Sequence, residues 1–291
     1  MGQYSIKEAE TLSGIKAHTL RIWEQRYDFL KPKRTDTKIR YYTDEQLRLI
    51  LNIGTLNRNG MKISKIAELN EAELNEAVLK IQTTTSEPDN FLDSLIQSMI
   101  NFDERRFEKT LSSAIIKLGF EETFVKLIFP FMLRTGVLWA TGAVSVAQEH
   151  FISNLIRRKL KVAIDNQYPE HTKTSKKFLL FLPEGETHEL LLLFTEYVLR
   201  KHNNHVIYLG AALPFEELGK AVEIAKPDYL VTYLTIPLEK TSVQSYLKKL
   251  SVANPKTKLI VGGVQLQSIK SALPANCIAI NSAEELLAVI R

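Results

Sequence analysis

A short polar turn, PEGETHEL at residues 183–190, holds the side chains best suited to chemistry. His188 stands two residues after Glu186, between an apolar run and a leucine-rich helical stretch. A carboxylate at this spacing can orient an imidazole toward a metal ion, as carboxylates do for metal-bound histidines. A histidine at a helix start more often makes only a local hydrogen bond or faces solvent, so this simpler interpretation stays open.

The elements that would position His188 alternate regularly between strand and helix. Short apolar runs lie at 178–183, 205–209, 229–235, 258–261 and 277–280, with helical stretches between them. This alternation predicts a doubly wound parallel sheet, a Rossmann-like domain over residues 176–291. Ligands bind such sheets at the carboxyl ends of the strands, and His188 closely follows the first strand. The pattern therefore favours the ligand interpretation.

Further segments precede the sheet domain. Residues 90–168 have helical periodicity throughout, and four amphipathic helices with short joins predict a four-helix bundle. A Ser/Thr-rich stretch with a proline at 76–89 is typical of a linker. Residues 1–75 are predicted to form short helices around an extended excursion with its tip near Asp36. The expected fold is multidomain, combining α and α/β parts.

Composition places the chain among ordinary globular proteins of two or three domains. It has 291 residues, 45% hydrophobic and 24% charged, and no apolar run long enough to span a bilayer. Its one cysteine, Cys277, excludes an internal disulfide and a Cys-rich zinc module. We therefore expect a cytoplasmic protein that does not contact membranes. The net charge of +5 is concentrated, because residues 1–66 contain 13 Lys and Arg against 7 Asp and Glu.

The basic N-terminal segment has the pattern of a helix-turn-helix. In the second of its short helices Leu20 and Trp23 would pack inward. The exposed face would present four residues to a DNA groove: Lys16, His18, Thr19 and Arg21. The stretch at 31–42 adds five cations backed by Tyr41 and Tyr42, which suits phosphate contact. A solvated basic surface would show the same charges, so both interpretations stay open.

Four stretches of this segment stand in a characteristic order: LRIWEQRY, Pro32–Arg34, RYYT at 40–43 and LNRNGMKISKIAEL. Together they resemble the winged helix-turn-helix of the MerR family of transcription regulators. The resemblance implies a wing around 31–42 and contact with double-stranded operator DNA by Arg21, Arg34, Arg40 and Tyr41. Many MerR members continue into a dimerising coiled coil, whereas no sustained heptad is visible here. We therefore expect a homo-oligomer, a dimer or tetramer, held by the C-terminal two-thirds of the chain.

Three motifs occur in order at the predicted strand ends of the sheet domain: Glu186-Thr187-His188, Thr232-Tyr233-Leu234 and Gly262-Gly263. The domain resembles the cobalamin-binding domain of corrinoid proteins. The resemblance implies that His188 is the lower ligand of cobalt, displacing the cofactor's own base. It also implies that Thr232, Gly262 and Gly263 accommodate the displaced nucleotide tail. The family's loop glycine corresponds to Leu191, whose side chain would crowd that tail.

The helical segment carries a further match, Trp139 followed after nine residues by Glu149-His150. This signature is similar to that of the CarH and LitR group, MerR-type regulators that sense light through adenosylcobalamin. The resemblance implies that Trp139 caps the upper face of the corrin and that Glu149 and His150 line the adenosyl side. A tryptophan in the core of the bundle is the alternative. Ala140 replaces a histidine of the photoreceptors that ligates cobalt after illumination, which argues against the same light response.

Three hypotheses for the whole protein follow. The first is a DNA-binding regulator, not an enzyme, whose C-terminal module senses a cobalamin, most readily adenosylcobalamin. The second is a MerR-type regulator that has lost cobalamin binding and is controlled by a protein anti-repressor, an interpretation that Leu191 and Ala140 favour. The third is a corrinoid carrier for methyl transfer. The sequence shows no nucleophile–base pair and no phosphate-binding loop, which argues against this hypothesis.

Overall fold

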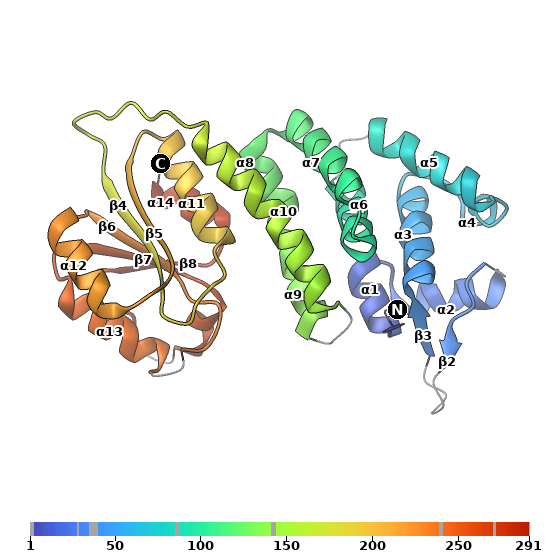
Figure 1. Cartoon of the computed structure of the whole chain (residues 1–291). Coiled ribbons are helices and arrows are strands. Elements are labelled where there is room, and N and C mark those ends of the chain that lie inside the picture. The colour runs from blue at the N-terminus through green and yellow to red at the C-terminus, as the bar shows by residue number, and fades with distance from the viewer. Residues whose placement is uncertain are drawn as a thin grey trace. The chain divides into compact units, whose positions relative to one another are not determined.

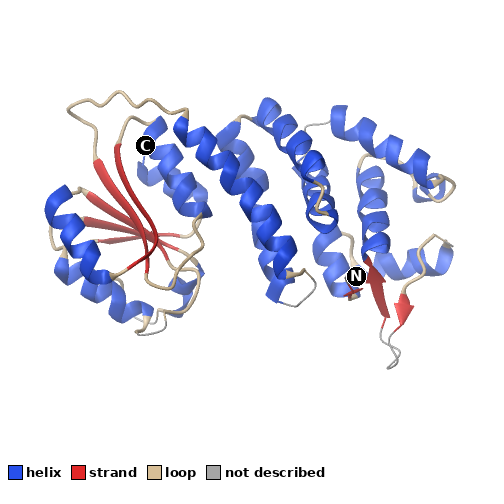
Figure 2. Cartoon of the chain, viewed as in Figure 1, coloured by secondary structure: helices blue, strands red, loops and turns tan. Residues whose placement is uncertain are grey.

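A computed structural model describes residues 3–27, 29–34, 40–84, 88–140, 144–238, 241–269 and 272–290. The chain forms two compact units, Met1–Leu155 and Ile156–Arg291 (Figure 1). Helices predominate in the first unit, and a parallel sheet occupies the second (Figure 2). This confirms the expected combination of α and α/β parts. Among the described residues, no helix has the length and apolarity needed to cross a membrane.

The first unit opens with the predicted short helices and wing. Its elements are β1 (Gln3–Tyr4), α1 (Ile6–Ser13), α2 (Ala17–Arg26), β2 (Lys33–Arg34), β3 (Arg40–Thr43), α3 (Asp44–Arg58), α4 (Ile63–Ile66) and α5 (Glu71–Thr84). The three strands form an antiparallel sheet in the order β1-β3-β2. The predicted wing tip near Asp36 lies outside the described residues.

Local capping chemistry fixes where these helices begin. Ser5 and Glu8 form a capping box at the start of α1, and Gly14 ends the helix with a left-handed φ of 71°. Thr43 and Gln46 form the same reciprocal pair at the start of α3. Each box satisfies backbone N–H groups that a helix start leaves without intrahelical partners.

A helical bundle follows, and its last helix continues past Leu155 into the second unit. Its elements are α6 (Pro88–Asn101), α7 (Glu104–Leu118), α8 (Phe120–Thr123), the π-helix η1 (Phe124–Ile128), α9 (Phe129–Ala140) and α10 (Val146–Asp165). One of the four predicted helices is therefore divided into α8, η1 and α9, and Pro130 gives the reason. Proline has no N–H to donate four residues back, and a π-turn accommodates the missing bond. The expected linker is also different, because α5 continues as a helix to Thr84.

A polar seam of side chains joins the winged module to the bundle between α3 and α6. Asp93 is 3% exposed, accepts a hydrogen bond from Thr55 Oγ1 at 2.6 Å, and forms an ion pair with Arg58. The Gln97 amide donates to Asn52 Oδ1 at 2.7 Å. Since buried polar groups are costly unless paired, these matched partners specify one docking of the two parts.

The second unit is the predicted doubly wound domain. Its elements are β4 (Lys177–Pro183), α11 (Leu190–Lys201), β5 (His205–Leu213), α12 (Phe215–Ala225), β6 (Tyr229–Tyr233), α13 (Val243–Ala253), β7 (Lys258–Gly262), the 3₁₀ helix η2 (Val264–Ser268), β8 (Cys277–Ile280) and α14 (Ala283–Ile290). All five strands are parallel, in the order β5-β4-β6-β7-β8. Helices α12 and α13 pack on one face, and α11 and α14 lie together on the other.

Removing the carboxylate of the polar seam should destabilise the first unit. We expect Asp93→Ala to lower the free energy of unfolding by about 2–4 kcal/mol, because it strands the Arg58 cation and the Thr55 hydroxyl. Lys126→Ala is the control, since Lys126 pairs with Glu122 on the exposed surface and should cost about 0.5 kcal/mol or less. Urea unfolding followed by circular dichroism measures both. Equal effects of the two substitutions would contradict the structural role of the seam.

Candidate functional site

The turn that carries His188 lies where the sheet changes its winding direction. The chain passes from β4 to β5 on one side of β4, and then returns to β6 on the other side (Figure 1). Loops diverge at this switch point, which is the usual ligand position in an open parallel sheet. His188 follows β4 here, as the sequence predicted.

Glu186 is the central residue of this turn, and its side chain is fully buried. One carboxylate oxygen accepts from the His188 backbone N–H at 3.0 Å and lies 2.6 Å from His188 Nδ1. The other oxygen accepts the backbone N–H groups of Thr235 and Ile236, at 2.6 and 3.0 Å. One carboxylate thus ties the loop after β4 to the loop after β6.

These contacts set the charge and orientation of the pair. Burial by itself raises the pKa of Glu186, but hydrogen bonds from the His188 ring and from the N–H groups of Ile236, His188 and Thr235 outweigh it, so the pKa lies below its ordinary value. An ionised carboxylate only accepts, so Nδ1 of His188 carries a proton. Nε2 is then the nitrogen with a lone pair, on a side chain that is 54% exposed.

A second polar group holds the start of α11 beside His188. The Tyr208 hydroxyl donates to Glu189 Oε1 at 2.9 Å, and Arg157 Nε lies 3.6 Å from Glu189 Oε2. Burial and the Glu189 charge raise the pKa of Tyr208, so the phenol stays a donor. The sequence patterns did not indicate this group of three side chains. The only local signal was a second carboxylate next to His188, since Tyr208 and Arg157 are distant in the chain.

The expected Thr232-Tyr233-Leu234 motif divides between the two faces of the sheet. Alternation along β6 places Thr232 on the face of Leu230 and Leu234, which pack against α12 and α13. Its buried hydroxyl has no hydrogen-bond partner among the described residues. Tyr233 points to the opposite face, where its hydroxyl lies 2.7 Å from Thr195 Oγ1 of α11. The structure therefore does not bring Thr232 to the α11 face.

Gly262 and Gly263 are both required by close internal packing. A Cβ on Gly262 would lie 2.7 Å from the Tyr233 ring. Gly263 has a φ of 105°, and a Cβ there would lie 2.3 Å from the Leu234 carbonyl oxygen. No other residue type fits at either position without movement of its neighbours.

The bundle signature falls on two helices of the first unit. Trp139 lies in α9, but its side chain is outside the described part of the chain. Glu149 and His150 occupy the first turn of α10, with His150 Nε2 3.6 Å from Glu149 Oε2. His150 is largely exposed and Glu149 is half-buried.

The predicted recognition helix α2 has the expected inner and outer faces. Leu20 and Trp23 are buried, as predicted. The outward residues are Lys16, His18 and Arg21, all exposed, and Thr19, half-buried. Ile22 is 44% exposed next to Arg21, so a prediction from hydrophobicity that places it on the apolar face with Leu20 and Trp23 is wrong.

Glu24 connects the recognition helix to the wing. It pairs with Arg40 at 3.1 Å and accepts a hydrogen bond from the buried Tyr42 hydroxyl. Arg40 therefore braces the wing against α2, in addition to the DNA contact expected from the sequence. Arg34 is exposed and Tyr41 half-buried on the same small sheet.

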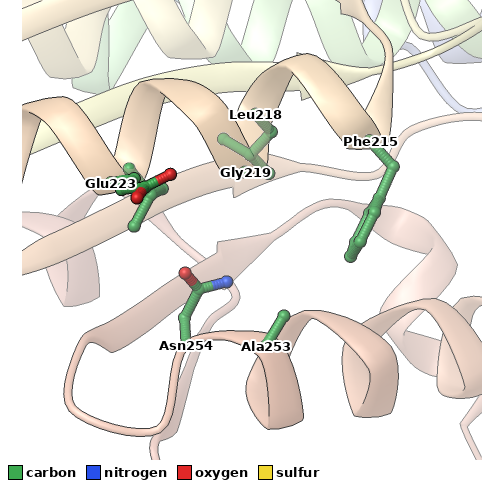
Figure 3. A pocket seen from close by; sticks show the side chains of 7 residues that line it. Phe215, Leu218, Gly219, Glu223, Ala253 and Asn254 are labelled. Carbon is green, nitrogen blue, oxygen red and sulfur yellow. The ribbon is translucent and has the colours of Figure 1, made fainter.

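A hollow of 190 Å³ opens on the other side of the sheet domain, between α12 and α13 (Figure 3). Phe215 and Leu218 contribute apolar walls, and Glu223 and Asn254 supply its polar side chains. It belongs to the face away from α11, so it is separate from the His188 turn. The described residues contain no group of three or more His, Cys, Asp or Glu side chains placed to hold a metal ion by themselves.

Comparison with known families identifies the type of the N-terminal winged module and of the helical bundle. Residues 4–73 match the MerR HTH family regulatory protein, and residues 91–164 match the B12 binding domain. The chain is therefore a DNA-binding transcriptional regulator that combines a MerR-type module at residues 4–73 with a B12 binding domain at residues 91–164.

Particular relatives match nearly the whole chain. It is 26% identical to the HTH-type transcriptional repressor CarH of Myxococcus xanthus, over 97% of this chain and 96% of CarH. It is 24% identical to the repressor CarA of the same organism, over 98% and 95% of the two chains. A corrinoid protein for monomethylamine from Methanosarcina barkeri aligns with 70% of this chain and 98% of its own, with a TM-score of 0.56 at 14% identity. That last similarity is one of fold.

The Glu186 contact makes a prediction about the His188 tautomer. Two-bond ¹H–¹⁵N spectra in alkaline buffer should show the proton of the neutral ring on Nδ1. In Glu186→Gln the amide oxygen can still accept from Thr235 and Ile236, which turns the NH₂ group toward Nδ1 and moves the ring proton to Nε2. The His202 signal should not change. A wild-type His188 protonated on Nε2 would contradict the geometry.

Proposed function

We propose that this regulator holds a corrinoid through His188 and that the bound state controls its affinity for operator DNA. The observation that carries the proposal is the Glu186 carboxylate, which holds His188 Nδ1 and joins the two loops of the switch point. A histidine presented in this way has the donor chemistry of a cobalt ligand, with its partner carboxylate behind it. These residues therefore fit the lower side of a corrin.

The upper side of the cofactor is assigned from the sequence signature. We assign Trp139 to cover the corrin, and Glu149 and His150 to line its upper ligand, which we propose is adenosyl. A bound adenosylcobalamin supplies a cobalt–carbon bond that can be broken, and so a chemical basis for two states. Ala140 offers no nitrogen to replace that upper ligand, so the signal here need not be light.

Control of DNA binding would pass through assembly. We propose three functional parts, residues 1–75 for DNA, 90–168 for the upper cap, and 176–291 for the lower ligand, acting in the cytoplasm. Corrinoid binding would favour one dimer or tetramer, and the spacing of its DNA modules would match or miss two operator half-sites. The repressor names of CarH and CarA support a repressing role for the DNA-bound protein.

A second function is supported by a specific observation. Tyr233 is buried against α11, where Thr195 links its hydroxyl to the Leu191 carbonyl in the first turn. This filled position favours a regulator that binds no cobalamin. In that case an anti-repressor protein would bind the C-terminal module and release the DNA. Retention of the cofactor on purification distinguishes the two functions.

The direct test is a visible absorption spectrum after incubation with adenosylcobalamin in the dark and desalting. We expect the wild type to retain the corrinoid, and His188→Ala and Glu186→Gln to lose it or to show an altered lower-ligand band. His202→Ala is the matched control, at the other end of α11. Equal retention by all four proteins would refute His188 as the ligand. Absence of any retained corrinoid, after the same incubation with adenosylcobalamin and with adenosylcobinamide, would favour the anti-repressor alternative.

DNA contact should divide between base reading by α2 and phosphate contact by the wing. Arg21→Ala should weaken specific binding by about 1–3 kcal/mol, and Arg34→Ala should reduce the slope of log affinity against log salt by about 1. Fluorescence anisotropy at several salt concentrations measures both, on operator and on random DNA. Lys256→Ala, in the sheet domain, should behave as wild type. An unchanged salt slope for Arg34→Ala would exclude the wing from the interface.

A further inference from the structure

We infer that Tyr233 closes the slot beside His188, so that the sheet domain selects corrinoids that lack a bulky lower nucleotide over complete cobalamins. The inference rests on the proposed function, because it assumes that His188 is the lower ligand. It assigns to Tyr233 a role in specificity for which the sequence motifs gave no direct indication.

The position of the ligating histidine determines where the lower nucleotide of a cobalamin has to lie. When a histidine ligates cobalt from below, the nucleotide arm on that side of the corrin can no longer do so. The arm remains covalently attached, so it must enter the protein next to the histidine. In this domain the layer that begins beside His188 lies between the first turn of α11 and the ends of β6 and β7, with Leu191, Tyr233 and Gly262 around it.

Protein side chains that are hydrogen-bonded to one another already fill this layer. Tyr233 is only 3% exposed, and its hydroxyl lies 2.7 Å from Thr195 Oγ1. Thr195 is fully buried and donates to the Leu191 carbonyl at 2.8 Å. A continuous chain of contacts therefore runs from β6 to the first turn of α11. Moving Tyr233 aside would expose a buried phenol and break its hydrogen bond with Thr195.

Gly262 has no side chain, and the space that this leaves is occupied by the ring of Tyr233. A Cβ at Gly262 would come within 2.7 Å of two carbons of the Tyr233 ring. The missing side chain at 262 thus makes room for Tyr233. Gly263 is likewise filled on its inner side by the backbone of Leu234. The space beside each glycine is therefore already occupied by protein atoms. The Tyr233 ring fills the space that the base of a lower nucleotide would need.

The test compares two ligands, adenosylcobinamide, which has no nucleotide, and adenosylcobalamin. Equilibrium dialysis in the dark, read by corrinoid absorbance, gives an affinity for each. We expect the wild type to prefer adenosylcobinamide by about ten-fold or more, since a closed slot rejects the larger ligand. Tyr233→Ser should reduce that ratio to about one or reverse it.

Two further variants show that the effect belongs to the ring at 233. Tyr233→Phe keeps the ring and should keep the wild-type ratio. Tyr229→Ser removes a tyrosine from the same strand and the same face, at its amino end, where it stacks on Phe178, and should leave the ratio unchanged. Because the readout is a ratio of two affinities in one protein, a general loss of stability does not imitate it. Circular dichroism confirms that each variant is folded.

The outcomes separate the two proposals. Wild-type protein that binds adenosylcobalamin as tightly as adenosylcobinamide, with no change in Tyr233→Ser, would overturn the role of Tyr233 and leave the proposed function standing. Binding of neither corrinoid by the wild type or by Tyr233→Ser would overturn both.

Discussion

The sheet domain depends on one carboxylate that is buried and yet ionised. Glu186 remains charged in the interior because four donors face it, two from its own turn and two from the loop after β6. Removing any one of these donors would leave a buried charge less well compensated, so the two loops hold each other in place. The orientation of His188, the start of α11 and the path of the chain beyond β6 all follow from this arrangement. The protein's own contacts therefore orient His188 without the help of a ligand.

Much of this architecture could be predicted, because it depends on residues that lie close together in the sequence. The capping boxes at Ser5 and Thr43 depend on residues three positions apart, and the five strands show as short apolar runs between helices. The position of His188 at a strand end follows from the same alternation. The family comparisons confirm the MerR module and the B12-binding bundle on the segments that the motifs indicated.

The parts that escaped prediction depend on which residues meet across the fold. Thr232 and Tyr233 are neighbours in sequence, but the alternation of a strand sends them to opposite faces, and only the register of β6 decides which one meets α11. The role of Gly262 is visible only once the Tyr233 ring lies above it. The helical period around Pro130 predicts one continuous helix, and it could not show that the helix passes through a π-turn there. The partners of Glu189 likewise come from distant elements.

The seam between α3 and α6 has a consequence for how the protein can change. Every residue of α6 from Asn90 to Ile100 is buried, apolar side chains such as Leu92 and Ile96 as well as Asp93. Separating α6 from α3 would therefore expose apolar surface and unpaired polar groups together. A substitution on one side of the seam needs a matching change on the other, so we expect the DNA-reading module and the bundle to be inherited as one piece.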